Sequence, residues 1–416
     1  MGGGPGHMRH PHDLHRVTSG NTLIELFIDI KEKVEASSII PDVKVDGINV
    51  SFKYTGGEFA VDRGSLKEID LSGITMARIG ERFAEGHGMR PAITKLLTIL
   101  NEAEAQIRPE MEKLGLISNP HYFLNTEYVE GTTNAIGYNE DFIAIHGVNA
   151  FYEKISRRAT RPGEKRPIDK NTGKPTKDPS VEVPYDQSAM MSLIDKLKPI
   201  AKKYNYAVYG PIPTSLRPVQ IEFEGSLSTP VNLQITEEGL QQKPELRKYL
   251  NKSLGQLLNI ITDKPGQYPN YPLVAMLDGK SRNPYHKVTY LQVIEEGIPV
   301  DHLAPIENVE TFIKGAVYMH ATRLLGNDVL SVLTSEIGNM VGDDGGQEGV
   351  VIRDSSLFNP GQPVVPFKLT GEFIKGGMYG VISQKMGAEK TTVSEQKLRG
   401  LIRKTLSQHV KAFSRL

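Results

Sequence analysis

Apolar residues recur at intervals of three and four along several stretches of the chain, a spacing typical of amphipathic helices. It predicts helices over residues 21–37, 93–115, 186–204, 243–263 and 306–338. Pro109 lies in the second of these stretches, where its missing backbone N–H is expected to break or kink the helix. The middle of the chain is therefore expected to be largely helical.

Strand-like runs lie on both sides of this helical region. Toward the N-terminus they cover 43–50, a hairpin about Gly56-Gly57, 121–131 and 140–148. Residues 346–375 return to strand character, and a short strand pair is predicted over 215–235. The combined pattern predicts an α+β fold.

Composition divides the chain into a terminal segment, a core in two parts, an inserted module and a basic helical tail. The expected boundaries are 1–20, 21–154 with 339–378, 155–338, and 379–416. The terminal segment begins with MGGGPGHM, which is typical of an expression tag, and is expected to be disordered. The inserted module begins with a basic, proline-rich loop over 157–180 that is nearly free of large apolar side chains, so we expect it to be solvated.

The 416 residues carry 49 basic and 49 acidic side chains, so the formal net charge is zero. This balance excludes a polycationic grip on nucleic acid over the whole surface, although a local basic groove is compatible with it. Cysteine is absent, which excludes disulfides, a cysteine nucleophile and Cys-based metal sites and fits a reducing compartment such as the cytoplasm. We expect no membrane association, since no apolar run approaches the ~18 residues of a membrane-spanning helix.

The first candidate for chemistry is Lys44, in the sequence Lys44-Val45-Asp46-Gly47. A lysine at the end of a buried strand is partly desolvated, and desolvation with nearby cations lowers the pKa of its amine. The neutral amine is a nucleophile. The same four residues also suit a surface turn with an ordinary lysine, so the motif alone does not decide between the two interpretations.

Four further charged residues follow Lys44 in an informative order. They are Arg63 before a glycine, Glu127 in a predicted strand, Glu348 at the start of another strand, and Lys368. Each alone has an ordinary explanation: a hairpin arginine, outward-facing strand carboxylates, and a lysine that protects a sheet edge. Their joint order favours a shared site.

This ordered series resembles the covalent nucleotidyltransferases, which include ATP-dependent DNA and RNA ligases and mRNA capping enzymes. Within this group, the lysine motif with Asn49 two residues after its glycine most resembles the RNA ligases of the phage and RNA-editing type. The resemblance covers roughly residues 40–150 and 340–375, under half of the chain. It implies an α+β nucleotidyltransferase core of antiparallel sheets around an ATP pocket, carrying a largely helical insertion.

The resemblance also implies a role for each residue. Lys44 would form a covalent lysyl-AMP, Lys368 would neutralise charge on the α-phosphate, and Glu348 would bind Mg²⁺. Arg63 would hold a phosphate or ribose oxygen, and Glu127 would accept a hydrogen bond from a ribose hydroxyl. Phe142 or His146 lies near the position of the base-stacking residue, although His146 also suits a core histidine. Further nucleotide contacts are expected from the residues of the lysine motif: Val43, Asp46, Gly47 and Asn49.

Three features depart from the family pattern. Pro366 stands where relatives carry a first motif V lysine, which would weaken phosphate stabilisation, and Lys375 is a candidate substitute. Glu127 and Glu348 are 221 residues apart (348 − 127), so the insertion must loop out, which costs little loop entropy. Only 48 residues follow Lys368 (416 − 368), too few for the OB-fold that DNA ligases and capping enzymes append.

We therefore expect an ATP-dependent polynucleotide ligase that acts on RNA ends in preference to DNA ends, with ATP and Mg²⁺ as cofactors. The insertion over 155–338 is a candidate docking site for a protein partner. Two alternatives stay open: a ligase-like protein that binds nucleotide or nucleic acid without catalysis, and nucleotidyl transfer to a non-nucleic acceptor.

Overall fold

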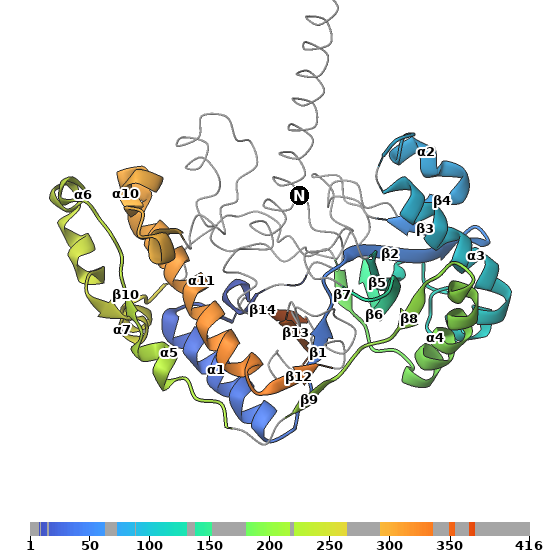
Figure 1. Ribbon diagram of the computed structural model, residues 1–416, viewed down its shortest axis with the longest axis horizontal. Coiled ribbons are helices and arrows are strands. Elements are labelled where there is room, and N and C mark those ends of the chain that lie inside the picture. Colours follow the sequence, from blue (N-terminus) through green and yellow to red (C-terminus); the bar gives the residue numbers. More distant parts are fainter. Residues whose placement is uncertain are drawn as a thin grey trace, which may run out of the picture.

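The computed structural model describes residues 8, 10–14, 16–62, 73–87, 89–130, 138–151, 180–216, 220–263, 292–335, 349–353 and 366–370. These residues form two lobes, one built on a large sheet and the other built of helices, with a small three-stranded sheet between them (Figure 1). The predicted α+β class is confirmed.

The large sheet has the strand order β4-β3-β2-β5-β6-β7, with β8 paired to β6. The strands are β2 Ile48–Thr55, β3 Glu58–Asp62, β4 Ile74–Thr75, β5 Tyr122–Val129, β6 Phe142–Phe151, β7 Ser180–Glu182 and β8 Ala207–Tyr209. The predicted hairpin at Gly56-Gly57 joins β2 to β3. β8 lies parallel to β6 because a helix carries the chain back across the sheet before β8 begins, so the sheet is mixed rather than antiparallel throughout.

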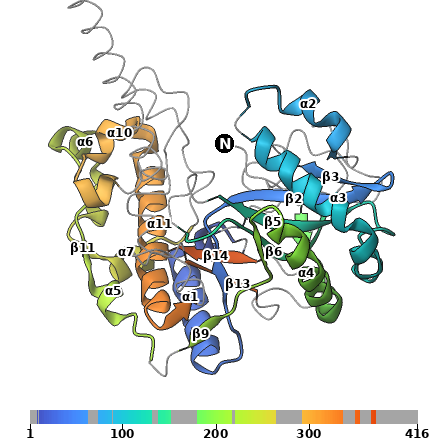
Figure 2. The same ribbon diagram turned by 45° about the vertical axis from the view of Figure 1, so that its right-hand side comes forward.

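Two long helices, α3 (Arg90–Lys113) and α4 (Gln187–Lys202), cover one face of the large sheet (Figure 2). The short turns η2 (Met76–Arg78) and α2 (Ile79–Arg82) precede α3. The predicted break at Pro109 is wrong, since α3 continues through this residue. Ile107 and Met111, on either side of the proline, are buried in the core, and this packing stabilises the helix against the lost hydrogen bond.

The small sheet has the order β1-β13-β14 and is antiparallel. Its strands are β1 Asp42–Lys44, β13 Gly349–Ile352 and β14 Phe367–Thr370. Val350 and Leu369 face the helical lobe and belong to its apolar core, whereas Lys44 and Lys368 occupy the alternate positions. Segments more than 300 residues apart in the sequence therefore meet in adjacent strands.

The helical lobe is built around α11 (Val309–Leu330), which is buried on nearly all sides. Its other helices are α1 Gly20–Glu35, α5 Glu224–Ser228, α6 Glu237–Gln242, α7 Leu254–Ile260 and α10 Val300–Leu303, with short turns η1 Pro11–Asp13, η3 Pro244–Tyr249, η4 Gln292–Glu296 and η5 Ile306–Asn308. Two strand pairs complete it: β9 (Thr214–Leu216) with β12 (Leu333–Ser335), and β10 (Pro230–Val231) with β11 (Lys252–Ser253). The strands predicted over 215–235 are thus present but pair with other segments.

The spatial units differ from the predicted segments in two places. Residues 180–209 add β7, α4 and β8 to the sheet lobe, while α1, expected in the core, packs on α7 and α11. Part of the terminal segment expected to be disordered is packed: Leu14 and Val17 are buried, and the Nδ1 of His12 lies 3.1 Å from the hydroxyl of Thr322. Apolar contact and a buried hydrogen bond explain this packing.

No helix in the described part of the chain combines the length and the apolar character needed to cross a bilayer. Several predicted features lie outside the described residues: Arg63, Glu348, Lys375, most of the basic loop over 157–180 and the tail over 379–416.

Candidate active site

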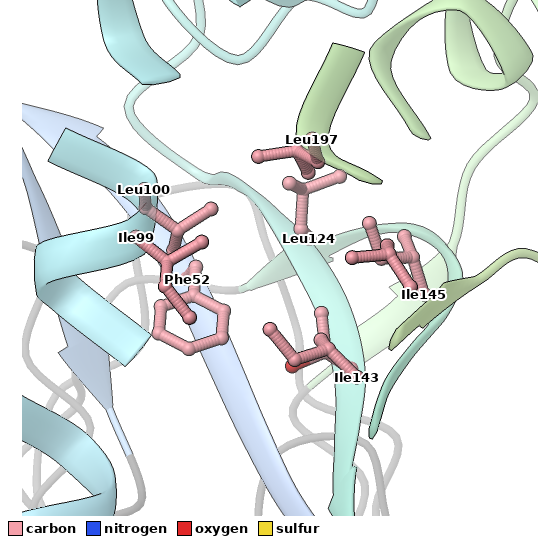
Figure 3. Close-up of a pocket in the computed structure, with 9 residues that line it drawn as sticks. Phe52, Ile99, Leu100, Leu124, Ile143, Ile145 and Leu197 are labelled. Carbon is pink, nitrogen blue, oxygen red and sulfur yellow. The ribbon is translucent and has the colours of Figure 1, made fainter. Parts of the chain in front are cut away.

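The two faces of the large sheet are both buried but differ in chemistry. Toward α3 and α4, the sheet presents apolar side chains such as Phe52, Leu124 and Ile145 (Figure 3). These enclose, with the helices, a cavity of about 10 Å³, which is apolar and at most the size of one water. This cavity is a packing defect of the core and cannot hold a nucleotide.

The opposite face carries a layer of polar side chains, here called the polar layer. Its members lie on β2, β5, β6 and β7: Asn49, Ser51, Asn125, Glu127, His146, Asn149 and Glu182. All are at least partly buried, although amides and carboxylates are costly to bury without partners. Sheet faces in protein interiors are normally apolar, so this face differs from an ordinary core and is the candidate for a binding surface.

Lys44 and Lys368 lie on one face of the small sheet. Lys44 is paired with Gly349, which is paired with Thr370 in turn. Two residues along β13, on the same face, Val351 is paired with both Asp42 and Lys368, and paired residues share a face. The two lysines therefore lie on the same face of the small sheet, on either side of β13, and both are buried, with exposed fractions of 9% and 5%. The Nζ of Lys44 donates a hydrogen bond of 3.2 Å to the carbonyl of Val45.

Glu127 lies at the centre of the polar layer. It is paired with Asn49 in β2, and its Oε2 lies 3.5 Å from the Nε2 of His146 in β6. Burial alone would raise the pKa of the Glu127 carboxyl, but the hydrogen bond from His146 and the positive charge of Lys44 bring this pKa below its ordinary value. The carboxylate is therefore ionised at neutral pH and lies within the electrostatic reach of the Lys44 amine.

Two glycines permit this close arrangement. A Cβ on Gly47 would lie 2.7 Å from the Cγ of Glu127 and 2.7 Å from the carbonyl oxygen of Tyr128. Gly349 has a φ of +147°, and a Cβ there would lie 1.9 Å from the carbonyl oxygen of Leu369. Glycine is thus required after the motif aspartate and at the start of β13, as the two motifs of the sequence indicate.

His146 occupies the irregular position of β6. The pairing with β5 shifts between Asn125 and Thr126, so that His146 is the extra residue of a β-bulge. Such a bulge redirects a side chain, and here it brings the imidazole to Glu127. Its predicted place near the base-stacking residue stays a prediction.

Phe142 and Val43 belong to a small apolar cluster beside the polar layer. Phe142 is fully buried, and its ring meets Tyr138 and Tyr209 edge to face at centroid distances of 5.2 and 5.3 Å. The hydroxyl of Tyr138 accepts a hydrogen bond of 2.8 Å from the backbone N–H of Asp46. The cluster therefore packs against the lysine motif and contacts it through Tyr138. The predicted stacking role of Phe142 stays a prediction.

Four buried polar atoms in or beside the polar layer have no hydrogen-bond partner within the described residues. They are the Oδ1 atoms of Asn49 and Asn149 and the hydroxyls of Ser51 and Thr370. Thr370 shares its row with Lys44, and Asn49 shares its row with Glu127. Buried orphan groups of this kind are expected where a ligand or water supplies the missing partner. The residues present thus fit a polar ligand such as the ribose and phosphate of a nucleotide.

The described residues contain no cluster of three carboxylate, imidazole or thiol groups placed to hold a metal ion. Mg²⁺ commonly uses only one or two carboxylates, together with substrate phosphates. The predicted metal ligand, Glu348, lies outside the described residues, as does Arg63. The predicted Mg²⁺ site therefore stays a prediction.

Sequence reasoning missed one charged group beside the site. Arg353, directly after β13, contacts Asp42 in β1 and Glu182 in β7. The sequence offers one signal for this group: a charged residue stands at an end of each of the three strands, Asp42 in β1, Glu182 in β7 and Arg353 after β13.

Comparison of this chain with protein-family models, with curated proteins and with solved structures found no match. The site must therefore be interpreted from its own residues.

Proposed function

We propose that this protein is an ATP-dependent polynucleotide ligase, acting on RNA ends in preference to DNA ends through a lysyl-AMP intermediate at Lys44. The finer fold assignment, a nucleotidyltransferase core with a helical insertion, is part of the same proposal. The observation that supports it is the electrostatic interaction of Lys44 with the buried carboxylate of Glu127, with Lys368 on the same face of the small sheet as Lys44. The positive charge of the two lysines suits a phosphate, and the carboxylate of Glu127 suits a ribose hydroxyl.

The chemistry follows from the groups that surround Lys44. The neutral amine attacks the α-phosphorus of ATP, so an N–P bond forms, the bond to pyrophosphate breaks and one of the two amine protons passes to water. Lys368 stabilises the negative charge that develops on the α-phosphate oxygens. Glu127 accepts a hydrogen bond from a ribose hydroxyl, and His146 holds the carboxylate in place. Mg²⁺, when bound, supplies further positive charge to the phosphates.

In the following steps AMP passes to a 5′-phosphate, and a 3′-hydroxyl then displaces it. RNA is preferred over DNA in this proposal because Asn49 follows the motif glycine by two residues, as in the RNA ligases that the lysine motif resembles. The unpartnered Oδ1 of Asn49 adds support, since it lies in the row of Glu127.

The test is covalent labelling with α-labelled ATP and Mg²⁺. We expect an acid-labile, alkali-stable label on the wild-type chain and none on Lys44→Ala. Lys53→Met is a matched control. Lys53 is a buried lysine like Lys44, but it lies on β2 and its Nζ donates a hydrogen bond to the carbonyl of Pro120. Label that survives in Lys44→Ala would contradict the assigned nucleophile. Nicked RNA, nicked DNA and single strands offered to the labelled protein would then identify the acceptor.

One observation favours a second function, binding without catalysis. Pro366 directly precedes β14, so the strand offers Lys368 alone where relatives offer two lysines. A protein that binds ATP but takes no label at any pH would support this second function. Label that passes to a protein rather than to nucleic acid would instead support nucleotidyl transfer to a non-nucleic acceptor.

A further inference from the structure

Three charged side chains join the small sheet to the large one. The Nε of Arg353 donates a hydrogen bond of 2.7 Å to the Oε2 of Glu182, and its Nη1 contacts the Oδ2 of Asp42. The three residues come from the end of β13, from β7 and from β1. One guanidinium thus holds two carboxylates from different sheets, and we call this group the Arg353 triad.

The triad depends on the shape and charge of arginine. A planar guanidinium can donate in two directions at once, whereas a lysine ammonium lacks this fixed fork. Burial raises the pKa of both the Asp42 and the Glu182 carboxyls, while the charge of Arg353 opposes this rise. Without Arg353, the two partly buried carboxyls would lose the guanidinium that contacts both of them, and the link between β1 and β7 would be lost.

The triad lies next to the candidate active site. Asp42 precedes Lys44 by two residues in β1, and alternate residues of a strand share a face. Glu182 is paired with Asn149 of the polar layer, on the sheet that carries Glu127. His146, which contacts Glu127, also acts electrostatically on both carboxylates of the triad. The contacts of Arg353 thus join the strand that carries Lys44 to the sheet that carries Glu127.

We propose that the Arg353 triad is the positioning element of Lys44: it clamps β1 onto the large sheet and so holds the Lys44 amine against Glu127. The inference rests on the proposed function only for its effect on nucleotidyl transfer. Its structural part, the placement and accessibility of the amine, can be measured without ATP.

The first experiment measures the reactivity of Lys44 in the absence of nucleotide. The full chain is treated with trace acetic anhydride, and the acetylation rate of each lysine is followed by peptide mass spectrometry. In Arg353→Met, we expect Lys44 to acetylate severalfold faster than in the wild type, because the parted sheets expose the amine. Lys314 and Lys248, which lie in the helical lobe, serve as internal references.

The second experiment measures labelling with ATP. A misplacement of about 1 Å can cost about 100-fold in rate, so Arg353→Met should lower the labelling rate by about 10- to 100-fold with a smaller change in KM. Arg353→Lys should recover part of the rate. The double variant Arg353→Met/Glu182→Gln should also recover part of it, because only one unpaired carboxylate remains.

Lys196→Met is the control for a purely structural effect. Lys196 lies on α4, behind the other face of the same sheet, and its Nζ is 2.6 Å from the buried carboxylate of Glu110. This variant also leaves a buried carboxylate without its cation, but far from Lys44. It should lower the unfolding temperature while leaving Lys44 acetylation and labelling unchanged. Should Arg353→Met prove too unstable to purify, Glu182→Gln is the milder perturbation, with the same expected direction.

The outcomes separate the two proposals. Lys44 acetylation at the wild-type rate in Arg353→Met and Glu182→Gln would overturn the positioning role, whatever happens with ATP. An equal effect in Lys196→Met would overturn it as well, because the response would then be general destabilisation. A wild-type protein that never takes AMP, while its Lys44 responds to Arg353→Met as expected, would overturn the ligase proposal alone.

Discussion

The substitution Gly47→Ala adds a single methyl group at the point where the lysine motif passes over β5. The new Cβ would lie 2.7 Å from the Cγ of Glu127, 2.7 Å from the carbonyl oxygen of Tyr128 and 2.9 Å from the Cγ2 of Val129. Distances under 3.0 Å cannot persist, so something must move. A neighbouring backbone atom and a buried valine leave little room, and Glu127 is the group that gives way.

The cost of this substitution can be bounded from the contacts. Overpacking a filled site typically costs about 1–3 kcal/mol, and three contacts with buried groups indicate the upper half of this range. Gly80→Ala is the matched control, because no atom of the described residues outside its own helical turn lies within 4 Å of its added Cβ. Gly80 lies in the short helix α2, where alanine is preferred over glycine by about 0.5–1 kcal/mol. The control should therefore be neutral or slightly stabilising.

The assay is urea unfolding followed by circular dichroism, with the labelling rate measured on the same samples. We expect Gly47→Ala to unfold at lower urea than the wild type and to label more slowly, since Glu127 is displaced. Gly80→Ala should match or exceed the wild type in stability and label normally. Indistinguishable unfolding midpoints for the two variants would show that the motif does not pack against β5 as described.

Two further predictions concern buried rings. Phe142→Ala should destabilise the protein by about 3–5 kcal/mol in urea unfolding, because a fully buried ring between two tyrosines leaves a cavity; a loss below 1 kcal/mol would contradict this packing. Burial, with the charge of Arg323, lowers the pKa of His320 from 6.5 to about 4, so the unfolded chain binds a proton there that the folded protein does not. Stability should therefore fall between about pH 6.5 and pH 4, by up to about 3 kcal/mol, and unfolding midpoints of His320→Gln should lack this part of the slope.

The longer elements of the fold follow from local patterns in the sequence. The helix predicted over 21–37 corresponds to α1, and the runs over 121–131 and 140–148 correspond to β5 and β6. Elements such as β7 and β8 have three residues each, which is too short for any periodicity to appear. Their partner in the sheet is β6, so the sheet lobe extends beyond the boundary that composition predicts.

The candidate site shows the same division between local and distant information. The local sequence predicts that Lys44 and Lys368 each lie in a strand. Only the pairing of both strands with β13 shows that the two lysines share a face. His146 depends on a bulge, which no residue pattern announces. Arg353 could not be found because its partners are 171 and 311 residues away in the sequence.

The polar layer lowers the stability of the folded protein relative to an apolar layer. An unpartnered buried polar group costs about 1–3 kcal/mol, and four such atoms lie in or beside this layer within the described residues. The opposite face of the same sheet uses leucine, isoleucine and phenylalanine at equivalent positions, so the sheet can be built without this cost. A ligand that bonds to Asn49 and Thr370 would recover it on binding. Under the proposed function, the free energy that the folded protein lacks here would contribute to nucleotide binding.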